Sequence, residues 1–411
     1  MRLLVVAPSF PYPAHPFAGA FNARCADVLV KKCQALEVLV PRPYVPPMFS
    51  LLSRRWRAYA TIKPIESRNG VQVHRPARLQ LPKVASSFWP DQGAFLCCRH
   101  SVRKRHKDVH FDAILSFDLV GAGGLAYRLG RDLGIPVAGW ATGGDVRVPS
   151  KSGYENLLLR VLRNLDVVFY QSHELREQAA NRLGVPPGQL AARHHVVLSR
   201  GILPPPALDI IDARRKARAA WGLSAGQIVV LFIGRIIRDK GISELVEAMR
   251  SAVASEPKLV CIMVGAMPGF DDSDQLKRRL ATDPILANHM KLLPACGPND
   301  VPHHLCGADI FAFPSHKEGM PNSLLEALGM GVPAVAFAIP PIREIESGTG
   351  CLSLVRPFDS NEFSRAILDL AASPENRRAM GEKGRSQTMA RFLMSRNMEY
   401  ALEHLQQVVS H

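Results

Sequence analysis

The chain has 411 residues, of which 47% are hydrophobic and 21% are charged, a balance that is typical of a globular protein and excludes a disordered one. One hydrophobic core seldom organises so long a chain, so we expect two domains of about 200 residues each. Residues 1–200 hold 28 Lys and Arg against 13 Asp and Glu, whereas residues 201–411 hold 23 of each, so the whole net charge of +15 lies in the first half. The first half is therefore expected to face an anionic partner.

The N-terminus, MRLLVVAPSFPYP, contains a short apolar run that could be mistaken for a secretion signal. Pro8 and Pro11 end this run too early, and residues 2–8 are better suited to a buried first strand. No uninterrupted apolar stretch reaches about 18 residues, so a membrane-spanning helix is not expected. The eight cysteines form no CxxC pair, which favours reduced thiols in a cytoplasmic protein.

Short apolar runs alternate with helix-like segments along the whole chain. Near-continuous apolar strands between helices are typical of parallel sheets that are covered on both faces. In the first half the predicted strands are residues 2–8, 36–41, 111–117, 135–140 and 166–172. In the second half they are residues 228–234, 258–265, 309–314 and 332–337. The pattern predicts two doubly wound, Rossmann-like α/β domains.

The boundary between the domains is expected where prolines interrupt the pattern. Pro204, Pro205 and Pro206 cannot continue a helix or a central strand. The prediction is therefore a first domain at residues 1–200, a linker at 201–225, a second domain at 226–390 and a last helix at 391–411.

Two segments of the first half, residues 48–60 and 99–107, concentrate basic side chains. The first mixes aromatic and aliphatic residues with arginines, as a membrane-interface segment would, and a solvated helix covering the sheet is the alternative. No recognised nucleic-acid-binding module accompanies the charge, so nucleic acid is not an expected partner. The glycines of residues 120–130 superficially suggest a dinucleotide fingerprint, but they follow the wrong strand and favour close packing of a helix on the sheet.

Two cations follow the strand at residues 228–234. Arg235 and Lys240 occupy the loop at its carboxyl end, and Gly241 precedes an amphipathic helix. A forked guanidinium and a point-charge ammonium at this position suit a diphosphate, whereas the alternative is a pair of solvated loop charges.

A second loop, SHKEGMPN at residues 315–322, follows the strand that ends at Pro314. It carries Glu318 at the edge of the sheet where open α/β folds bind ligands, and the next helix carries Glu326. Gly319 permits close approach to a ligand, and the helix offers free N–H groups from Asn322 and Ser323. Ser323-Leu-Leu-Glu326 is also a capping-box pattern, in which Glu326 would only stabilise its own helix.

Metal ligands are not expected. The Asp272-Ser-Asp274 stretch resembles a metal-binding DxD motif, but it directly precedes QLKRRLA and favours a helix start. The adjacent histidine pairs at 194–195 and 303–304 lack ligand partners at useful spacing, so we interpret them as structural.

Three features of the second half together carry a family resemblance. These are the GR-x4-KG stretch at residues 234–241, the MVG strand end at Gly265, and the EGMPNSLLEA run with its glutamates eight residues apart. They resemble the retaining glycosyltransferases of family 4, of the bacterial surface-polysaccharide type, whose GT-B fold consists of two Rossmann-like domains facing across a cleft. The resemblance is dense in residues 225–360, thin in residues 40–110, and reaches from the glycine loop at Gly19 to the last helix.

The resemblance implies a role for each of these residues. Arg235 and Lys240 would hold the diphosphate of a nucleotide-sugar without a metal ion or other cofactor. Glu318 would contact hydroxyls of the transferred sugar, and Glu326 the ribose hydroxyls. The catalytic candidates are thus Arg235, Lys240 and Glu318, and the donor-binding candidates are Gly19, Gly234, Gly265, Gly319, Met320, Asn322, Ser323 and Glu326.

The sequence departs from the family pattern at two places. Family members often have a histidine before the Gly-x-Asp of the first domain, where this chain has Thr142, followed by Asp145. Thr142 and Asp145 are therefore the acceptor-side candidates. Ser199-Arg200-Gly201 stands where the family usually has Asn-Gly.

The function implied is a retaining, metal-independent glycosyltransferase of the hexosyltransferase type. It would move a sugar from a UDP- or GDP-linked donor on the second domain to a glycan or polyprenyl-diphosphate-linked acceptor on the first. The last helix would return to the first domain, and the basic half predicts a cytoplasmic protein peripherally bound to the anionic inner face of the plasma membrane. The alternatives are a nucleotide-sugar epimerase or phosphorylase on the same fold, and a non-catalytic nucleotide-sugar-binding protein.

Overall fold

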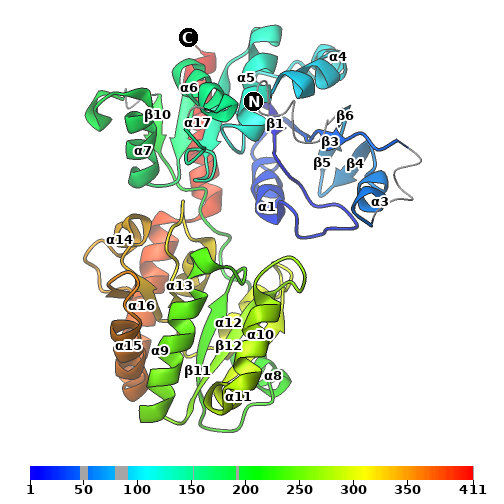
Figure 1. The fold of residues 1–411 in the computed structure, drawn as a ribbon. Helices are drawn as coiled ribbons and strands as arrows, with labels where there is room; N and C mark the ends of the chain where they lie inside the picture. The colour runs from blue at the N-terminus through cyan, green and yellow to red at the C-terminus, as the bar shows by residue number, and fades with distance from the viewer. Residues whose placement is uncertain (47–53, 79–90, 151, 191–193, 411) are drawn as a thin grey trace. The chain divides into compact units, whose positions relative to one another are not determined.

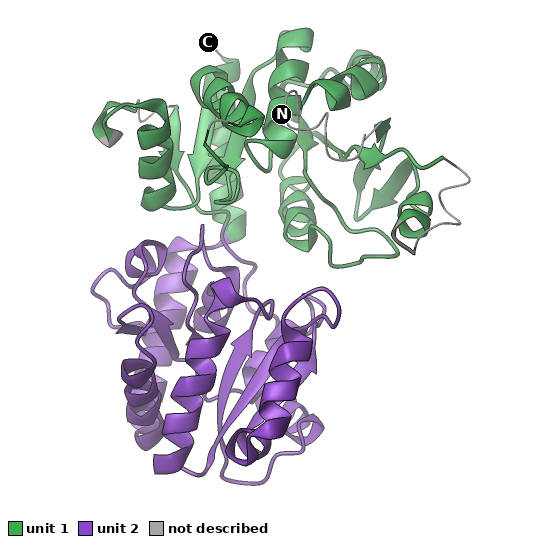
Figure 2. Ribbon diagram, in the orientation of Figure 1, with its two compact units in different colours: residues 1–200, 394–411 green, residues 201–393 purple. Residues whose placement is uncertain are grey.

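A computed structural model describes residues 1–46, 54–78, 91–150, 152–190 and 194–410 (Figure 1). The chain divides into two compact units (Figure 2). Unit 1 comprises residues 1–200 and 394–411, and unit 2 comprises residues 201–393. Each unit is a sheet covered by helices, as the alternation of apolar strands and helices predicts.

Unit 1 contains a sheet in the order β10-β9-β8-β7-β1-β2-β5-β4, in which β4 alone of the described strands runs antiparallel to its neighbour. Its strands are β1 (Arg2–Val6), β2 (Ala35–Leu39), β4 (Ile65–Arg68), β5 (Val71–His74), β7 (Ala113–Ser116), β8 (Val137–Ala141), β9 (Val167–Tyr170) and β10 (His195–Val197). The short strands β3 (Arg42–Pro43) and β6 (Ala77–Arg78) pair separately. All five strands predicted for this half are present.

Helices cover both faces of this sheet. They are α1 (Ala20–Leu29), α3 (Arg54–Ala60), α4 (Gln92–Val109), α5 (Gly121–Leu133), α6 (Gly153–Asn164), α7 (His173–Leu183) and α17 (Met394–Val409), with a 3-10 turn at Pro187–Gln189. Residues of α4, α5 and α6 belong to the core on one face, and residues of α1 and α17 to the core on the other. A Cβ atom at Gly130 of α5 would overlap the side chain of Val137, so the predicted role of these glycines in close helix–sheet packing is confirmed.

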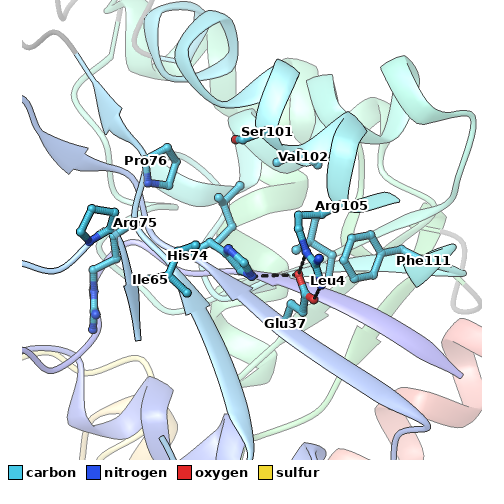
Figure 3. Close-up of a pocket in the computed structure, with 12 residues that line it drawn as sticks. Leu4, Glu37, Ile65, His74, Arg75, Pro76, Ser101, Val102, Arg105 and Phe111 are labelled. Atoms are coloured by element: carbon cyan, nitrogen blue, oxygen red, sulfur yellow. Dashed lines mark hydrogen bonds and ion pairs between the residues drawn. The ribbon is translucent and has the colours of Figure 1, made fainter. Parts of the chain in front are cut away.

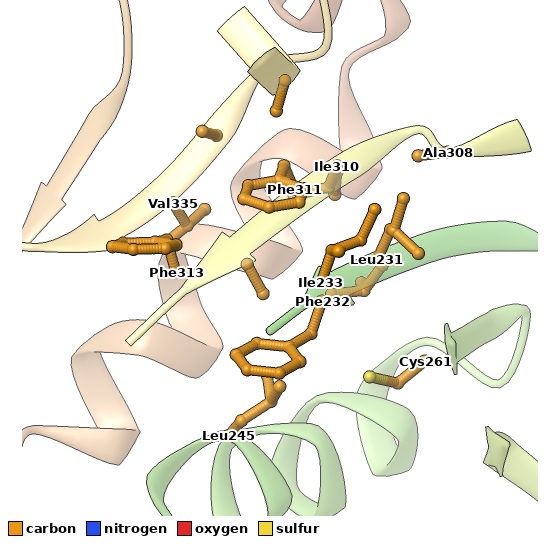
Figure 4. Close-up of a cluster of buried hydrophobic side chains, with 14 of the residues drawn as sticks. Leu231, Phe232, Ile233, Leu245, Cys261, Ala308, Ile310, Phe311, Phe313 and Val335 are labelled. Carbon is orange, nitrogen blue, oxygen red and sulfur yellow. The ribbon is translucent and has the colours of Figure 1, made fainter. Parts of the chain in front are cut away.

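Unit 2 contains an all-parallel sheet in the order β13-β12-β11-β14-β15-β16. Its strands are β11 (Ile228–Ile233), β12 (Leu259–Ala266), β13 (Met290–Pro294), β14 (Ile310–Phe313), β15 (Ala334–Phe337) and β16 (Ser353–Val355). Its helices are α8 (Ile210–Ala220), η2 (Arg238–Lys240), α9 (Ile242–Ser255), α10 (Ser273–Thr282), α11 (Pro284–His289), α12 (Val301–Gly307), α13 (Asn322–Gly329), α14 (Pro340–Glu346), α15 (Ser360–Ala372) and α16 (Pro374–Arg391). Buried side chains of the central strands, such as Phe232 and Phe311, form its core (Figure 4).

The segment predicted as a linker, residues 201–225, lies in unit 2 instead and contains α8. Pro204, Pro205 and Pro206 interrupt regular structure only locally. The helix after them, α8, packs on unit 2 through buried apolar residues and ion pairs. Trp221 is buried, and Arg214 and Arg218 both pair with Asp309 at the start of β14. Unit 2 therefore begins directly after Arg200, and the helix assigned to unit 1 at the end of the chain starts at Met394 rather than at residue 391.

The two basic segments differ in what the structure describes. Residues 48–53 of the first lie outside the described residues, and α3 begins at Arg54. In α3 the rings of Trp56 and Tyr59 are half-buried, 6.3 Å apart, and Arg57 is exposed. The second segment lies on α4, where Arg103 pairs with Asp132 at 2.5 Å. None of the described helices is both long enough and apolar enough to cross a membrane.

Candidate functional site

The strand order of unit 2 reverses between β11 and β14. From β11 the sheet continues through β12 to β13, and from β14 it continues through β15 to β16. Loops that leave the carboxyl ends of two such strands diverge to opposite sides and open a crevice, which is where doubly wound folds bind ligands. The loops carrying the predicted catalytic residues follow these two strands.

The loop after β11 is fixed at its base and charged at its tip. Gly234 donates its N–H to the carbonyl of Val264 at 3.0 Å, and Ile236 is fully buried. Arg235 lies between them and is exposed. The buried Ile236 directly after Arg235 anchors the backbone of this arginine at the carboxyl edge of the sheet and leaves its side chain exposed.

Gly241 brings the loop after β11 against the loop after β14. Its backbone is left-handed, with φ of 67°, and a Cβ atom here would overlap the carbonyl oxygen of Pro314. The N–H of His316 donates to the carbonyl of Asp239 at 2.9 Å, and Lys317 pairs with the Asp239 carboxylate at 2.9 Å. The two loops are therefore one connected structure.

Lys240 and Glu318 meet in this structure. The Lys240 ammonium contacts Oε1 of Glu318, and the hydroxyl of Ser315 donates to the same oxygen at 2.6 Å. The side chains of Lys240 and Glu318 are 20% and 12% exposed, so the pair is shielded but reachable. The structure thus joins two of the three catalytic candidates in direct contact, and it adds Ser315, which sequence reasoning missed.

The helix after this loop, α13, begins at Asn322, with Pro321 in the N-cap position. Its first N–H groups, from Asn322, Ser323 and Leu324, have no acceptor inside the helix, as in every α-helix. Gly319 and Met320, which lead into it, are buried. The Oδ1 atom of Asn322 is buried without a hydrogen-bond partner.

The capping box expected as an alternative at Ser323 and Glu326 is not formed. Ser323 lies inside α13 rather than at its N-cap, and no side chain caps this helix end. The sequence pattern places the N-cap at Ser323, but the N-cap is Pro321, two residues earlier in the chain. Glu326 is half-buried and close enough to Cys296, in the loop after β13, to contribute after burial and Asp300 to the raised pKa of that thiol.

Gly265 stands at the end of β12, beside the loop after β11. Its φ is 139°, and a Cβ atom would overlap the carbonyl oxygen of Gly234. Gly234 and Gly265 therefore let two neighbouring loops approach each other, which leaves backbone rather than side chains at this part of the sheet edge.

In unit 1 the strand order reverses between β1 and β7, and Gly19 lies in the loop after β1. Gly19 is left-handed, and a Cβ atom would overlap the carbonyl oxygen of Ser9. Asn22, in the first turn of α1, donates its side-chain amide to the same oxygen at 2.9 Å. The loop is therefore tightly folded onto itself.

Thr142 and Asp145 follow β8. The Asp145 carboxylate is buried and accepts hydrogen bonds from the backbone N–H groups of Thr142, Gly143 and Val146 at 2.8–3.1 Å, and from that of Leu119 at 3.0 Å. Its observed contacts are those of a residue that positions two loops. Thr142 is half-buried at the rim of the same loop.

Two polar residues of unit 1 were not among the site residues predicted from the sequence. Arg200 is 2% exposed and donates to the Asn22 side chain at 2.8 Å and to the carbonyl of Phe117 at 2.6 Å. Asp118, two residues after the end of β7, accepts from the N–H groups of Ala122 and Gly123. Burial, and then the neighbouring Asp145, raises the pKa of Asp118 to about 6. A polar residue just after a buried strand at a switch point was the signal for Asp118.

The residues considered for metal binding have other partners. Asp271 accepts from the N–H of Ser273 at 3.0 Å, and Asp274 from the N–H of Gly269 at 3.0 Å, at the start of α10. The predicted helix start is confirmed. Across the described ranges, no cluster of three His, Cys, Asp or Glu side chains could hold a metal ion. His194 and His195 contact the Asp166 carbonyl and the Tyr170 hydroxyl, which supports their structural interpretation.

A protein-family model matches most of the second unit. Residues 213–387 match the family model described as glycosyl transferases group 1. The teichuronic acid biosynthesis glycosyltransferase TuaC of Bacillus subtilis is 27% identical over 369 residues, which cover 89% of this chain and 88% of the relative. A GDP-mannose-dependent phosphatidylinositol monomannoside mannosyltransferase of Mycolicibacterium smegmatis is 27% identical, with 80% and 83% covered.

Solved structures share the fold along the whole chain. Sucrose-phosphate synthase from Thermosynechococcus elongatus superposes with a TM-score of 0.73 at 17% identity, covering 100% of both chains. Anabaena HepE, solved in complex with UDP, gives a TM-score of 0.71 at 17% identity, covering 99% of this chain and 100% of the other. The predicted GT-B fold is confirmed, and the chain is a glycosyltransferase with a glycosyl transferases group 1 domain at residues 213–387.

Proposed function

We propose that this glycosyltransferase takes its sugar from a UDP- or GDP-linked donor held by unit 2, retains the anomeric configuration and uses no metal ion. The contact between Lys240 and Glu318 at the switch point, beside the N-terminus of α13, is the observation that carries the proposal. A relative named as GDP-mannose-dependent and a neighbour solved with UDP-glucose support a nucleotide-linked donor.

Breaking the bond between sugar and phosphate places negative charge on the leaving diphosphate. Three positive groups lie at the carboxyl edge of the unit 2 sheet: Arg235, Lys240 and the free N–H groups of α13. They stabilise the negative charge of the diphosphate where it develops. The cations supply the stabilisation that a metal ion gives in other enzymes, which is why the proposal needs none.

Glu318 and Glu326 have separate roles in the proposal. Glu318 is held by Lys240 and Ser315, so its carboxylate is oriented before the donor arrives, and it accepts hydroxyl groups of the transferred sugar. Glu326, one helical turn into α13 and without a capping role, accepts the ribose hydroxyls. Orientation by neighbours in the free protein lowers the cost of arranging the site on binding.

The acceptor in this proposal is a glycan on a polyprenyl-diphosphate, held by unit 1 at the surface of an anionic membrane. The excess of basic residues in the first half and a relative named for a phosphatidylinositol monomannoside substrate support it. The ion pair between Arg103 and Asp132 reduces the free charge of α4, so we assign the membrane contact to the segment at residues 48–60.

The function is tested by incubating the protein with labelled UDP- and GDP-sugars and a bacterial lipid extract, with and without EDTA. We expect label in the lipid phase, in an amount that EDTA does not reduce. We also expect NMR to show the same anomeric configuration in the product as in the donor. Rearranged nucleotide-sugar would instead indicate an epimerase. Binding of the donor without any turnover would indicate a non-catalytic binding protein.

Membrane contact is tested by co-sedimentation with vesicles of increasing anionic lipid content. Each basic residue near such a surface contributes about 1 kcal/mol, so changing Arg54, Arg55 and Arg57 together to Gln should abolish most of the binding. Binding of the native protein should also weaken as salt shortens the Debye length from about 10 Å at 0.1 M to about 3 Å at 1 M. Equal binding to neutral and anionic vesicles would contradict the proposal.

A further inference from the structure

A cavity of about 210 Å³ lies between helix α4 and the sheet of unit 1 (Figure 3). Its walls are mostly apolar and come from the strands β1, β2, β4 and β5, from α4 and from the segments that follow β5 and α4. The apolar residues that matter here are Leu4, Leu39, Ile65, Pro76, Val102 and Phe111. Engineered apolar cavities of roughly 150 Å³ bind benzene, so this one is large enough for a branched hydrocarbon group.

One end of the cavity carries a closed group of charges. Glu37, in the middle of β2 and 5% exposed, contacts Arg105 and lies 3.0 Å from Nε2 of His74 (Figure 3). Arg105 also donates its Nε–H to Glu37 at 3.2 Å. Burial alone would raise the pKa of Glu37, but the contact with His74 and the hydrogen bonds from Arg105 outweigh it and lower the pKa to about 2.

This charge group fixes the chemistry of a ligand. The Glu37 carboxylate is compensated by its two partners, and Arg75, also at the cavity, directs its guanidinium to Glu66 and to the carbonyl of Pro11 instead. An ionic ligand that took Glu37, Arg75 or Arg105 as its partner would have to displace existing ion pairs, at a large cost. An uncharged apolar ligand can enter without disturbing them.

The mouth of the cavity follows directly on the segment assigned to the membrane. Pro64 and Ile65 are exposed residues of the cavity lining, so we take them as its mouth, and they come four and five residues after the end of α3. Ile65 is 59% exposed, although it is a large apolar side chain on a strand. The mouth of the cavity is therefore close in sequence to the segment to which we assign the membrane contact.

We propose that this cavity binds an isoprenoid segment of the lipid-linked acceptor. The inference rests on the proposed function, because it names the part of that acceptor which unit 1 recognises. The branched chain occupies the apolar cavity beside Leu39 and Val102, and the closed charge group of Glu37 ends the cavity without contributing a charge of its own.

The test uses the full chain and geraniol, an uncharged isoprenoid alcohol that carries no sugar or phosphate, with glycerol as the polar control probe. Binding is measured by calorimetry without any donor. Ile65→Arg places a charge at the mouth, and Val102→Phe fills the cavity. Leu96→Arg is the matched control, because Leu96 is 61% exposed on α4 and does not line the cavity.

Geraniol, but not glycerol, should bind the native protein and Leu96→Arg alike, and both Ile65→Arg and Val102→Phe should weaken it at least about tenfold. In transfer assays Ile65→Arg should raise KM for a polyprenyl-linked acceptor and leave kcat unchanged. No binding of geraniol to the native protein, or equal binding to all four proteins, would overturn the inference while leaving transfer itself intact. Geraniol binding without transfer to lipid would overturn the proposed function instead and support the cavity as a hydrocarbon site.

Discussion

The ammonium of Lys240 already has a partner before any donor binds. Its contact with Glu318 means that the cation and the carboxylate are placed together, at the edge where the diphosphate and the sugar are expected to meet. Lys240→Ala should therefore lower kcat at least about a hundredfold, and Arg235→Ala should do the same, as is usual when a charge-stabilising group is removed.

Lys317→Ala is the matched control for these two variants. Lys317 lies in the same loop and is 60% exposed, but its partner is Asp239 rather than Glu318. Exposed ion pairs contribute little, so its turnover should stay within about twofold of the native value. Near-normal turnover in both Lys240→Ala and Arg235→Ala would rule out the diphosphate assignment.

The proposed roles of Glu318 and Glu326 are separable by the ligand that each would contact. Glu326→Gln should weaken the binding of bare UDP or GDP about tenfold, the scale of one charge-assisted hydrogen bond. Glu318→Gln should spare that binding and weaken the complete nucleotide-sugar. Calorimetry with both ligands on both variants checks this, and equal effects on the two ligands would show that the roles are not separate.

Asp118 gives a pH dependence whose sign can be worked out. Its pKa is about 6 in the folded protein and about 4 in the unfolded chain, so the folded state binds the proton more tightly. Its contribution to stability is complete below the unfolded pKa and is lost as the pH rises through 6. We therefore compare the unfolding free energy of Asp118→Asn with that of the native chain at two pH values. The variant's advantage should be greater at pH 7.5 than at pH 4.5, by about 1 to 3 kcal/mol.

Urea unfolding of both proteins at the two pH values measures this difference. Asn keeps a carbonyl oxygen for the N–H groups of Ala122 and Gly123, so the loop after β7 retains its acceptor. The same difference in unfolding free energy at both pH values would show that the Asp118 carboxyl does not titrate in this range.

At the scale of elements, the contact between two loops depends on Gly241. Gly241→Ala would force a left-handed backbone on a side chain that also overlaps the Pro314 carbonyl. We expect a loss of about 2 to 4 kcal/mol in unfolding free energy and a fall in turnover, because the loop that carries Lys240 moves away from Glu318.

Gly226→Ala separates strain from crowding. Gly226 has a positive φ of 84°, but a Cβ atom there meets nothing within 4 Å. Gly226→Ala should lower the unfolding free energy by about 1 kcal/mol and leave turnover unchanged. Thermal unfolding measures the stability of both variants, and kinetic assays measure their turnover. If Gly241→Ala and Gly226→Ala lose turnover equally, the close approach at Pro314 has no catalytic importance.

The elements that were predicted from the sequence are those whose burial leaves a pattern. Long apolar strands such as β11 and β12 are buried on both faces, so their residues are uniformly apolar. The strand β4, with the sequence IESR, is half-exposed at the sheet edge and has no such pattern, although Asn69-Gly70 before β5 is a hairpin signal that could have revealed it.

The site was predictable to the level of its loops but not of its contacts. The positions of Arg235, Lys240 and Glu318 after strands followed from the apolar runs before them. The contact of Ser315 with Glu318 depends on how two loops pack, and the absent capping box on where Pro321 begins a helix. Neither is recorded in local sequence, because tertiary packing decides between local alternatives.

At the scale of the whole molecule, unit 2 is one continuous piece of chain whose two ends are adjacent. Ile202 donates its N–H to the carbonyl of Phe392 at 2.7 Å. The fragment 201–393 should therefore fold alone and bind UDP or GDP within about fivefold of the full chain's affinity. A cooperative thermal transition and calorimetry check this, and an unfolded fragment would show that unit 2 needs unit 1 for its stability.

Unit 1, in contrast, is assembled from both ends of the chain. The helix α17 buries Met394, Met398, Leu402 and Leu405 in the core of unit 1, and Asn397 donates to the carbonyl of Ser199 at 2.8 Å. Burial of such side chains contributes about 1.5 to 3 kcal/mol each, which together approaches the whole stability of a domain of about 5 to 15 kcal/mol.

This division sets an order for folding during synthesis. Domains usually fold as they leave the ribosome, the N-terminal one first. Here the first 200 residues emerge without the helix that completes their core, whereas unit 2 has all of its residues once Leu393 is made. Unit 2 can therefore finish folding before unit 1. A nascent chain stalled before Met394 would hold all of unit 2, with the proposed nucleotide site, and a first unit whose apolar face still lacks the cover of α17.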